Sequence, residues 1–229
     1  MLSDHPVIHV GCYFNMIAVI MCGGKGSRFI TTGRTEKPLA RIKGRTLIET
    51  VLHAVILSGQ FSKILCVSSP YSPYTTQLLK KICRTDNKID VLVADGLGFS
   101  KDLFKALNSM LEQKVFTFPS DLALLDSDTV GKLVKKCTPS IHNTCIAAVA
   151  AKSFTNSLGM ACSSLVAIDG EDYCYSGICG FYLGKTISDN PFEQSYCIVN
   201  EIRLAVNVNT ASDLRFAEQL LGRVNLDIL

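Results

Sequence analysis

The segment that decides the fold is IAVIMCGGKGSR, which runs from Ile17 to Arg28. Its first five residues are apolar and rich in β-branched side chains, which predicts a short strand buried on both faces. Three glycines within four residues follow, so that backbone N–H groups can turn toward a phosphate without clashes from Cβ atoms. A turn without a ligand needs only one or two glycines. We therefore expect a phosphate-binding loop made by Gly23, Gly24, Lys25, Gly26, Ser27 and Arg28.

Spacing excludes two other glycine-rich loops. A Walker loop requires G-x-x-x-x-G-K-[ST], and no glycine stands at that distance before a Gly-Lys-Ser or Gly-Lys-Thr run. A dinucleotide-binding loop requires G-x-G-x-x-G, and here Phe29 occupies the position of the last glycine. A phenylalanine there obstructs the close packing of helix on strand that this glycine permits. A nicotinamide-dependent oxidoreductase is therefore disfavoured.

From this segment onward, apolar strand-like runs alternate with amphipathic helical stretches. The predicted strands are Ile17–Met21, Ile64–Val67, Ile89–Val93, Val115–Phe118 and Cys145–Ala150, and the predicted helices between them are Leu47–Leu57, Pro73–Ile82, Lys101–Leu111 and Ser127–Lys136. This alternation is typical of βαβ units. It predicts an α/β protein with a Rossmann-like, mostly parallel sheet flanked by helices.

The regular alternation weakens between Ser153 and Tyr196. Two apolar runs, Ser164–Ile168 and Ile178–Leu183, are separated by polar residues that include the turn former Asp169-Gly170. We interpret this region as a small antiparallel excursion from the sheet. Loops on such a segment are a natural place to recognise a variable second substrate.

The C-terminal part predicts one more strand and one more helix. The strand is Ala205–Val208 and the helix is Ser212–Leu221. Thr210 lies three residues before Asp213, a spacing close to that of a capping box, so the helix is expected to begin there.

Composition favours one folded domain. The chain has 229 residues, of which 48% are hydrophobic and 19% charged, enough for one sizeable core. We assign residues 16–229 to a single domain and residues 1–15 to an N-terminal extension that need not be ordered. The net charge of +3 is not concentrated in a basic run, which argues against nucleic acid as a partner.

Neither a membrane span nor a disulfide is expected. The apolar stretch Val7–Cys22 is shorter than the roughly 20 residues that a membrane helix needs, and no basic segment opens it. The ten cysteines are scattered singly without a C-x-x-C pair, so we interpret them as buried thiols rather than zinc ligands or disulfides. These features predict a cytoplasmic protein.

A second motif, Glu36-Lys37-Pro38-Leu39, follows the glycine loop. Pro38 keeps Lys37 in an extended conformation, which aims the lysine rather than turning it into a helix. Combined with G-G-x-G-x-R at this distance, the motif resembles the nucleotidyltransferases built on a glycosyltransferase-like α/β fold. With Ser68-Ser69-Pro70, Ser120-Asp121-Leu122 and Asn207-Val208-Asn209-Thr210, the chain resembles the archaeal adenosylcobinamide-phosphate guanylyltransferases, which are similar to the molybdenum-cofactor guanylyltransferases.

The resemblance covers about residues 16 to 221 and implies a set of roles. Gly23, Gly24, Gly26 and Arg28 would wrap the triphosphate of GTP, Lys37 would contact phosphate, Gly96 and Gly98 would line the base and ribose, and Gly177 would border the acceptor. Lys25, Ser27, Glu36 and Asp95 complete the expected nucleotide contacts, and Arg28, Lys37 and Asp121 are the expected catalytic residues. The chain departs from the family pattern at Cys22, where a small alanine is usual, and in a longer loop at Phe29–Thr35.

Asp121 is also a candidate on its position alone. It follows the run Val115–Phe118, at the carboxyl end of a predicted parallel strand, where α/β sheets bind ligands. Mg2+ on a triphosphate is held by one or two protein oxygens, so we expect a solvated carboxylate that binds Mg2+. A helix cap or a loop acid is the simpler alternative. Asp126 and Asp128 are expected to cap the next helix.

Asn209 resembles the neutral amide that completes the metal site of these enzymes, and a simple turn residue is nearly as good an explanation. The expected activity is transfer of GMP from GTP to a phosphorylated cobinamide, with release of pyrophosphate. Two alternatives stay open: transfer to another phosphorylated acceptor, such as a molybdopterin, a sugar phosphate or a polyol phosphate, and a GTP-binding module without turnover. The expected partners are these small molecules, and a homodimer is left open.

Overall fold

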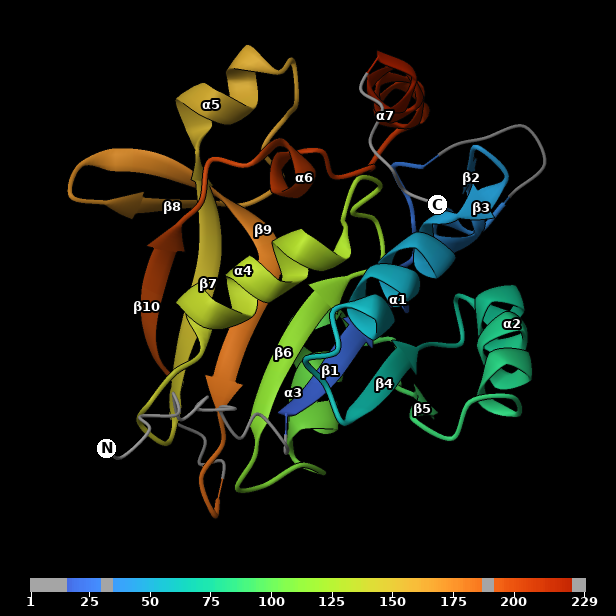
Figure 1. The fold of residues 1–229 in the computed structure, drawn as a ribbon, viewed down its shortest axis with the longest axis vertical. Helices are drawn as coiled ribbons and strands as arrows, with labels where there is room; N and C mark the ends of the chain where they lie inside the picture. Colours follow the sequence, from blue (N-terminus) through green and yellow to red (C-terminus); the bar gives the residue numbers. More distant parts are fainter. Residues whose placement is uncertain (1–15, 30–34, 187–191, 224–229) are drawn as a thin grey trace, which may run out of the picture.

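The computed structural model describes residues 16–29, 35–186 and 192–223 (Figure 1). Its strands are β1 Met16–Met21, β2 Arg41–Ile42, β3 Arg45–Thr46, β4 Lys63–Ser68, β5 Ile89–Val93, β6 Lys114–Pro119, β7 Thr144–Ala151, β8 Leu165–Ile168, β9 Glu171–Tyr182 and β10 Glu193–Ile198. Its helices are α1 Leu47–Leu57, α2 Pro73–Cys83, α3 Phe99–Leu107, α4 Ser127–Cys137, α5 Lys152–Ser157, α6 Ile202–Ala205 and α7 Ala211–Arg223, with a 3-10 turn, η1, at Lys37–Leu39.

One mostly parallel sheet organises these elements. Its strand order is β10-β7-β9-β6-β1-β4-β5, with β8 paired to β9. β1 runs parallel to β4 and β6, β4 to β5, and β7 to β10. The register pairs Met21 with both Val67 and Pro119. The carboxyl ends of β1, β4 and β6 therefore meet at one edge of the sheet, where α/β folds bind ligands.

The two faces of the sheet are covered differently. In β1, Met16, Ala18 and Ile20 pack with α1, α2 and α4, whereas Ile17, Val19 and Met21 pack with α3. This alternation is the period-2 pattern of a strand buried on both faces. Figure 1 shows α1 and α4 crossing in front of the sheet and α3 behind it.

The antiparallel excursion is confirmed and is larger than expected. β8 and β9 form a hairpin through Asp169-Gly170, both of which have positive φ, and β9 then continues antiparallel to both β6 and β7. The sequence analysis did not predict β10, which runs parallel to β7 at the outer edge of the sheet. The residues of β10 are exposed or half-buried, so this strand lacks the apolar run that reveals a buried strand.

The predicted strand Ala205–Val208 is wrong. Residues 202–205 form the short helix α6, and only an isolated bridge joins Leu122 to Asn207. Leu204, Ala205, Val206 and Val208 are all buried. Val206 and Val208 pack with α7 and the segment after β6, and Leu204 packs in the main core, so their apolar character records burial rather than strand pairing.

Two predicted helix starts are confirmed. Asp213 accepts hydrogen bonds from the backbone N–H groups of Asn209 and Thr210, both at 2.8 Å, while its own N–H donates to Thr210 Oγ1 at 3.2 Å. Asp126 caps α4 by accepting from the N–H of Thr129 at 2.9 Å. Asp128 lies in the first turn of α4 and does not cap it.

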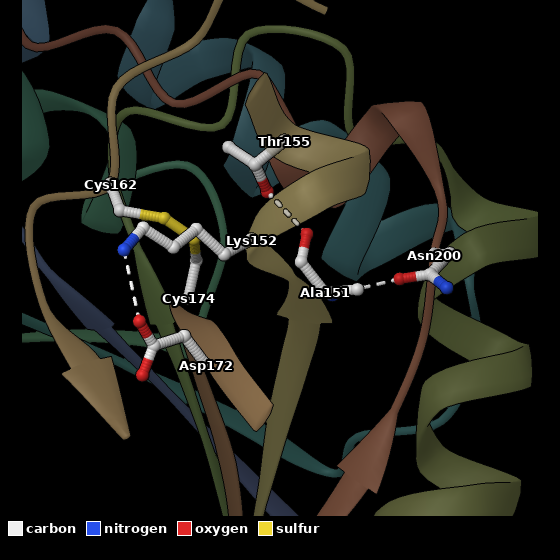
Figure 2. The surroundings of a disulfide bond; sticks show 7 residues. All are labelled: Ala151, Lys152, Thr155, Cys162, Asp172, Cys174 and Asn200. Carbon is white, nitrogen blue, oxygen red and sulfur yellow. Dashed lines mark hydrogen bonds and ion pairs between the residues drawn. A yellow bond between two sulfur atoms is a disulfide. The ribbon is translucent and has the colours of Figure 1, made fainter. Parts of the chain in front are cut away.

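The expectation that every cysteine is a free thiol is wrong for Cys162 and Cys174, which form a disulfide (Figure 2). The pairing follows from tertiary structure: the chain returns through the β8–β9 hairpin and places the two Cα atoms 5.5 Å apart. Beside the disulfide, Lys152 on α5 forms an ion pair with Asp172 on β9 at 2.9 Å (Figure 2). The remaining described cysteines are free thiols, and Cys22, Cys66, Cys137 and Cys145 among them are buried.

No helix within the described ranges is both long and apolar enough to cross a bilayer. The N-terminal extension, residues 1–15, and most of the long loop at Phe29–Thr35 lie outside the described residues.

Candidate active site

The glycine loop follows β1 and packs against the segment after β4. A Cβ atom on Gly23 would lie 2.9 Å from Ser69 Cβ and 3.0 Å from Ser68 C, so only glycine fits. Gly26 has a φ of +59°, in the left-handed region that favours glycine. Lys25 Nζ lies 4.6 Å from the centre of the Tyr71 ring, a cation–π contact that holds the lysine at the rim of the loop.

Three other segments of the chain meet beside this loop. Lys37, in η1, forms an ion pair with Asp121, which follows β6. Lys37 Nζ also donates to Asn209 Oδ1 at 3.3 Å, and Arg28 donates to the same oxygen at 3.3 Å. The backbone supports this meeting, because Val208 N donates to Asp121 O at 3.0 Å. Arg28, Lys37, Asp121 and Asn209, expected separately from sequence, thus form one cluster.

Asp121 is buried rather than solvated, which corrects the sequence expectation. The residue is 8% exposed, and the ion pair with Lys37 balances its charge. Its second oxygen, Oδ1, is buried and has no hydrogen-bond partner. A buried carboxylate oxygen without a partner is costly unless a ligand completes it, so this oxygen is the atom best suited to bind a cation.

A second glycine segment, with Gly96 and Gly98, also borders the site. Gly96 and Gly98 have φ values of +72° and +112°, and a Cβ on Gly96 would lie 2.7 Å from the ring of Tyr71. Asp102 on α3 is buried, and its Oδ1 accepts from the N–H groups of Gly96 at 3.1 Å and Leu97 at 3.2 Å. Sequence reasoning missed Asp102, although its position in the first turn of an amphipathic helix was a signal for such a contact.

A cavity of about 840 Å³ connects these parts. The sequence-predicted residues that line it are Gly23, Gly24, Lys25, Gly26, Ser27, Arg28, Lys37, Gly96, Gly98, Asp121, Gly177 and Asn209. Gly177 has a φ of +83°, and a Cβ there would lie 2.9 Å from Pro119 Cγ. Close approach of β9 to the end of β6 therefore requires this glycine.

Two residues that were expected to contact the nucleotide, Glu36 and Asp95, interact with other parts of the protein instead. Glu36 accepts from Tyr74 N, Thr75 N and Thr75 Oγ1 at 2.8, 2.7 and 2.6 Å, so its carboxylate satisfies the free N–H groups at the start of α2. Asp95 forms an exposed ion pair with Lys105 at 2.8 Å. Neither residue lines the cavity.

The wall of the cavity opposite the glycine loop was missed by sequence reasoning. It contains Ser163, Ser164, Tyr175, Ser176 and Gln194. These residues come from the loop before β8 and from β9 and β10. Their common location depends on the order of strands in the sheet, which no local pattern reveals.

The two thiols that line the cavity are poor nucleophiles. The pKa of Cys22 is raised well above its ordinary value, mainly by a hydrogen bond with Cys66 and also by burial. For Cys179, the hydrogen bond with Cys145 and then burial raise the pKa strongly. Both thiols therefore stay protonated at neutral pH, and the reactive species of cysteine is the thiolate.

Comparison with known proteins gives a consistent picture. A family model described as the MobA-like NTP transferase domain matches residues 18–171. The adenosylcobinamide-phosphate guanylyltransferase of Methanocaldococcus jannaschii is 28% identical, in an alignment that covers 92% of this chain and 100% of that protein.

Two solved structures share the fold. The 4-diphosphocytidyl-2C-methyl-D-erythritol synthase of Anaerococcus prevotii aligns with a TM-score of 0.62 at 15% identity, over 92% of this chain and 97% of that one. A hypothetical transferase from Thermus thermophilus aligns with a TM-score of 0.52 at 18% identity, over 74% of this chain and 66% of that one.

Proposed function

Because this chain belongs to the MobA-like NTP transferase family and is therefore a nucleotidyltransferase, we propose that it transfers GMP from GTP to adenosylcobinamide phosphate and releases pyrophosphate. The observation that carries the proposal is the cluster of Arg28, Lys37, Asp121 and Asn209 beside the glycine loop. The M. jannaschii relative, aligned over almost the whole chain, supports the choice of nucleotide and acceptor.

The residues of the cluster fit a magnesium ion bound together with the triphosphate. Asp121 Oδ1 is buried without a partner, and Asn209 offers a neutral amide oxygen beside it. The described residues contain no group of three or more His, Cys, Asp or Glu side chains suited to a metal, but Mg2+ on a nucleotide needs only one or two protein oxygens besides the phosphates. When bound there, the ion would neutralise negative charge on the phosphates.

The reaction needs no protein nucleophile. An oxygen of the acceptor phosphate attacks the α-phosphorus of GTP, the bond from that phosphorus to the bridging oxygen breaks, and pyrophosphate leaves. An acceptor phosphate is already ionised at neutral pH, so no strong general base is required. Lys25, Arg28 and Lys37 line the cavity on the glycine-loop side and would neutralise charge and align two anionic partners, which is the main task in phosphoryl transfer.

The test is a matrix of substrates. The purified protein is incubated with Mg2+ and each of the four ribonucleoside triphosphates, together with adenosylcobinamide phosphate, molybdopterin, a sugar phosphate or a polyol phosphate, and pyrophosphate release is measured. We expect release only with GTP and adenosylcobinamide phosphate. Turnover with a different acceptor or base would contradict the proposal, and GTP binding without turnover on any acceptor would favour a binding module.

A further inference from the structure

The two sides of the cavity differ in charge. Among the described lining residues, the charged side chains are Lys25, Arg28, Lys37, Asp102 and Asp121, which belong to the glycine loop, η1, α3 and the end of β6. On the opposite wall, the described lining side chains of the β8–β10 region are uncharged: Ser163, Ser164, Tyr175, Ser176, Cys179 and Gln194 among them. We call Ser163, Ser164, Tyr175, Ser176 and Gln194 the neutral wall.

A hydrogen-bonded chain organises the neutral wall. Gln194 Nε2 donates to the Tyr175 hydroxyl at 2.8 Å, and that hydroxyl donates in turn to the hydroxyl of Tyr196 at 3.4 Å. The rings of Tyr175 and Tyr196 pack edge to face with their centres 6.2 Å apart. Burial, and then the hydrogen bond with Tyr196, raises the pKa of Tyr175, so the tyrosine stays uncharged at neutral pH.

The sheet explains how residues from two strands make one surface. Tyr175 lies on β9 and Gln194 and Tyr196 lie on β10, with β7 between them. At the crossing point β7 carries Ala147, which is paired with Tyr196 and lines the cavity. A methyl side chain there leaves room for the tyrosine and glutamine to meet above the strand. On the other side, the disulfide joins Cys162 to Cys174, each the immediate neighbour of a residue of the neutral wall.

We propose that Tyr175 and Gln194 determine acceptor specificity, by recognising an uncharged part of the acceptor that carries carboxamide or hydroxyl groups next to its phosphate. This inference rests on the proposed transfer to a phosphorylated acceptor. The acceptor phosphate must lie near Lys37 and Asp121 to reach the α-phosphorus, so the rest of the acceptor extends toward the neutral wall.

The chemistry of the neutral wall decides between classes of acceptor. A second anionic group on the acceptor would lose water there without meeting a cation, which is costly. Carboxamides and hydroxyls instead pair well with the amide of Gln194 and the hydroxyls of Ser163, Ser164 and Tyr175. The hydroxyl of Ser176 already donates to Ala148 O and accepts from Ile178 N. Tyr196 accepts from Tyr175 and is a positioning residue, since it does not line the cavity.

The experiment compares acceptor kinetics in three variants. Tyr175→Phe and Gln194→Ala should raise KM for adenosylcobinamide phosphate by roughly five- to tenfold, with kcat and KM for GTP little changed, because each removes about one hydrogen bond made to the acceptor. Gln194→Arg should lower kcat/KM for this acceptor and raise it for an acceptor with a second phosphate, such as a sugar bisphosphate. Tyr173→Phe is the matched control, because its hydroxyl bonds to Glu171 outside the cavity.

The possible failures are distinct. If the wild-type protein uses adenosylcobinamide phosphate but the variants keep its KM, or if Gln194→Arg gains nothing with the bisphosphate, the inference is wrong and the proposed function stands. If the wild-type protein prefers an acceptor with two anionic groups, both are wrong. If it prefers another acceptor with a single phosphate, the proposed function alone fails, and a rise in KM for that acceptor in the same variants decides the inference.

Discussion

At the scale of single residues, the ion pair between Lys37 and Asp121 is the centre of the site. Both side chains are largely buried, with exposed fractions of 18% and 11%. Without a ligand each charge balances the other. In the proposed complex Lys37 would contact phosphate and Asp121 would bind the cation. Each residue would therefore keep a partner of opposite charge throughout the reaction.

Removing the lysine tests its part in the reaction. Lys37→Ala should lower kcat by roughly 100-fold and weaken GTP binding much less, because a cation on the reacting phosphates stabilises the transition state more than the ground state. Steady-state kinetics and direct GTP binding measure the two effects. Lys105→Ala is the matched control, since it also removes a lysine paired with an aspartate, but outside the cavity. Loss of affinity with unchanged kcat would place Lys37 away from the reaction centre.

Replacing the carboxylate tests the cation site. Asp121→Asn should keep the fold, because the amide oxygen can still accept from Lys37. Activity should nevertheless fall by roughly 100-fold or more, since a charged metal ligand is lost. High Mg2+, or Mn2+, should restore part of it, while GTP affinity in EDTA should hardly change.

The matched control for this exchange is Asp90→Asn, at an exposed position on β5, which should behave like wild type. Near-normal turnover of Asp121→Asn at low Mg2+ would remove Asp121 from the cation site. Unfolding of the variant would instead assign the carboxylate a purely structural role.

At the scale of elements, η1 and α2 are joined through Glu36. Its carboxylate accepts three hydrogen bonds at the start of α2, where the free N–H groups and the helix dipole favour a negative charge. Glu36→Ala should therefore lower the free energy of unfolding by about 1–2 kcal/mol, measured by denaturant titration. Lost GTP affinity at unchanged stability would instead support the nucleotide contact expected from sequence.

The disulfide ties the loop before β8 to β9. Cys162 and Cys174 are 12 residues apart, and closing a loop of this size stabilises by about 3 kcal/mol in the chain-entropy description. Dithiothreitol should therefore lower Tm by roughly 6–12 °C. The double variant Cys162→Ser, Cys174→Ser should start at the lower Tm and not respond. An equal response in both proteins would assign the effect to other cysteines.

At the scale of the whole molecule, β1 is the first strand of the chain that the structure describes, and it lies inside the sheet. Met16 is its first residue and is already 2% exposed, within the core. We therefore expect deletion of residues 1–15 to leave the fold and turnover intact, measured by circular dichroism and pyrophosphate release. A truncated protein that fails to fold, or folds without activity, would show that the extension belongs to the domain or to an interface.

The sequence by itself determined the class of fold and the glycine-loop side of the site. The buried strands β1 and β6 are marked by local apolar runs, and the loop from Gly23 to Arg28 depends on glycine and charge within a few residues. Such features are encoded locally, so periodicity and motif spacing reveal them. The same reasoning placed Asp121 correctly at the end of β6.

Only the tertiary structure decided how these pieces meet. Lys37 and Asp121 are 84 residues apart, and Tyr175 reaches Gln194 across β7 because of the strand order. Glu36 was expected from sequence to contact the nucleotide, and in the fold it caps α2. The strand expected at Ala205–Val208 failed for the same reason: apolar residues record that a segment is buried, whereas the order of strands in the sheet decides which neighbours bury it.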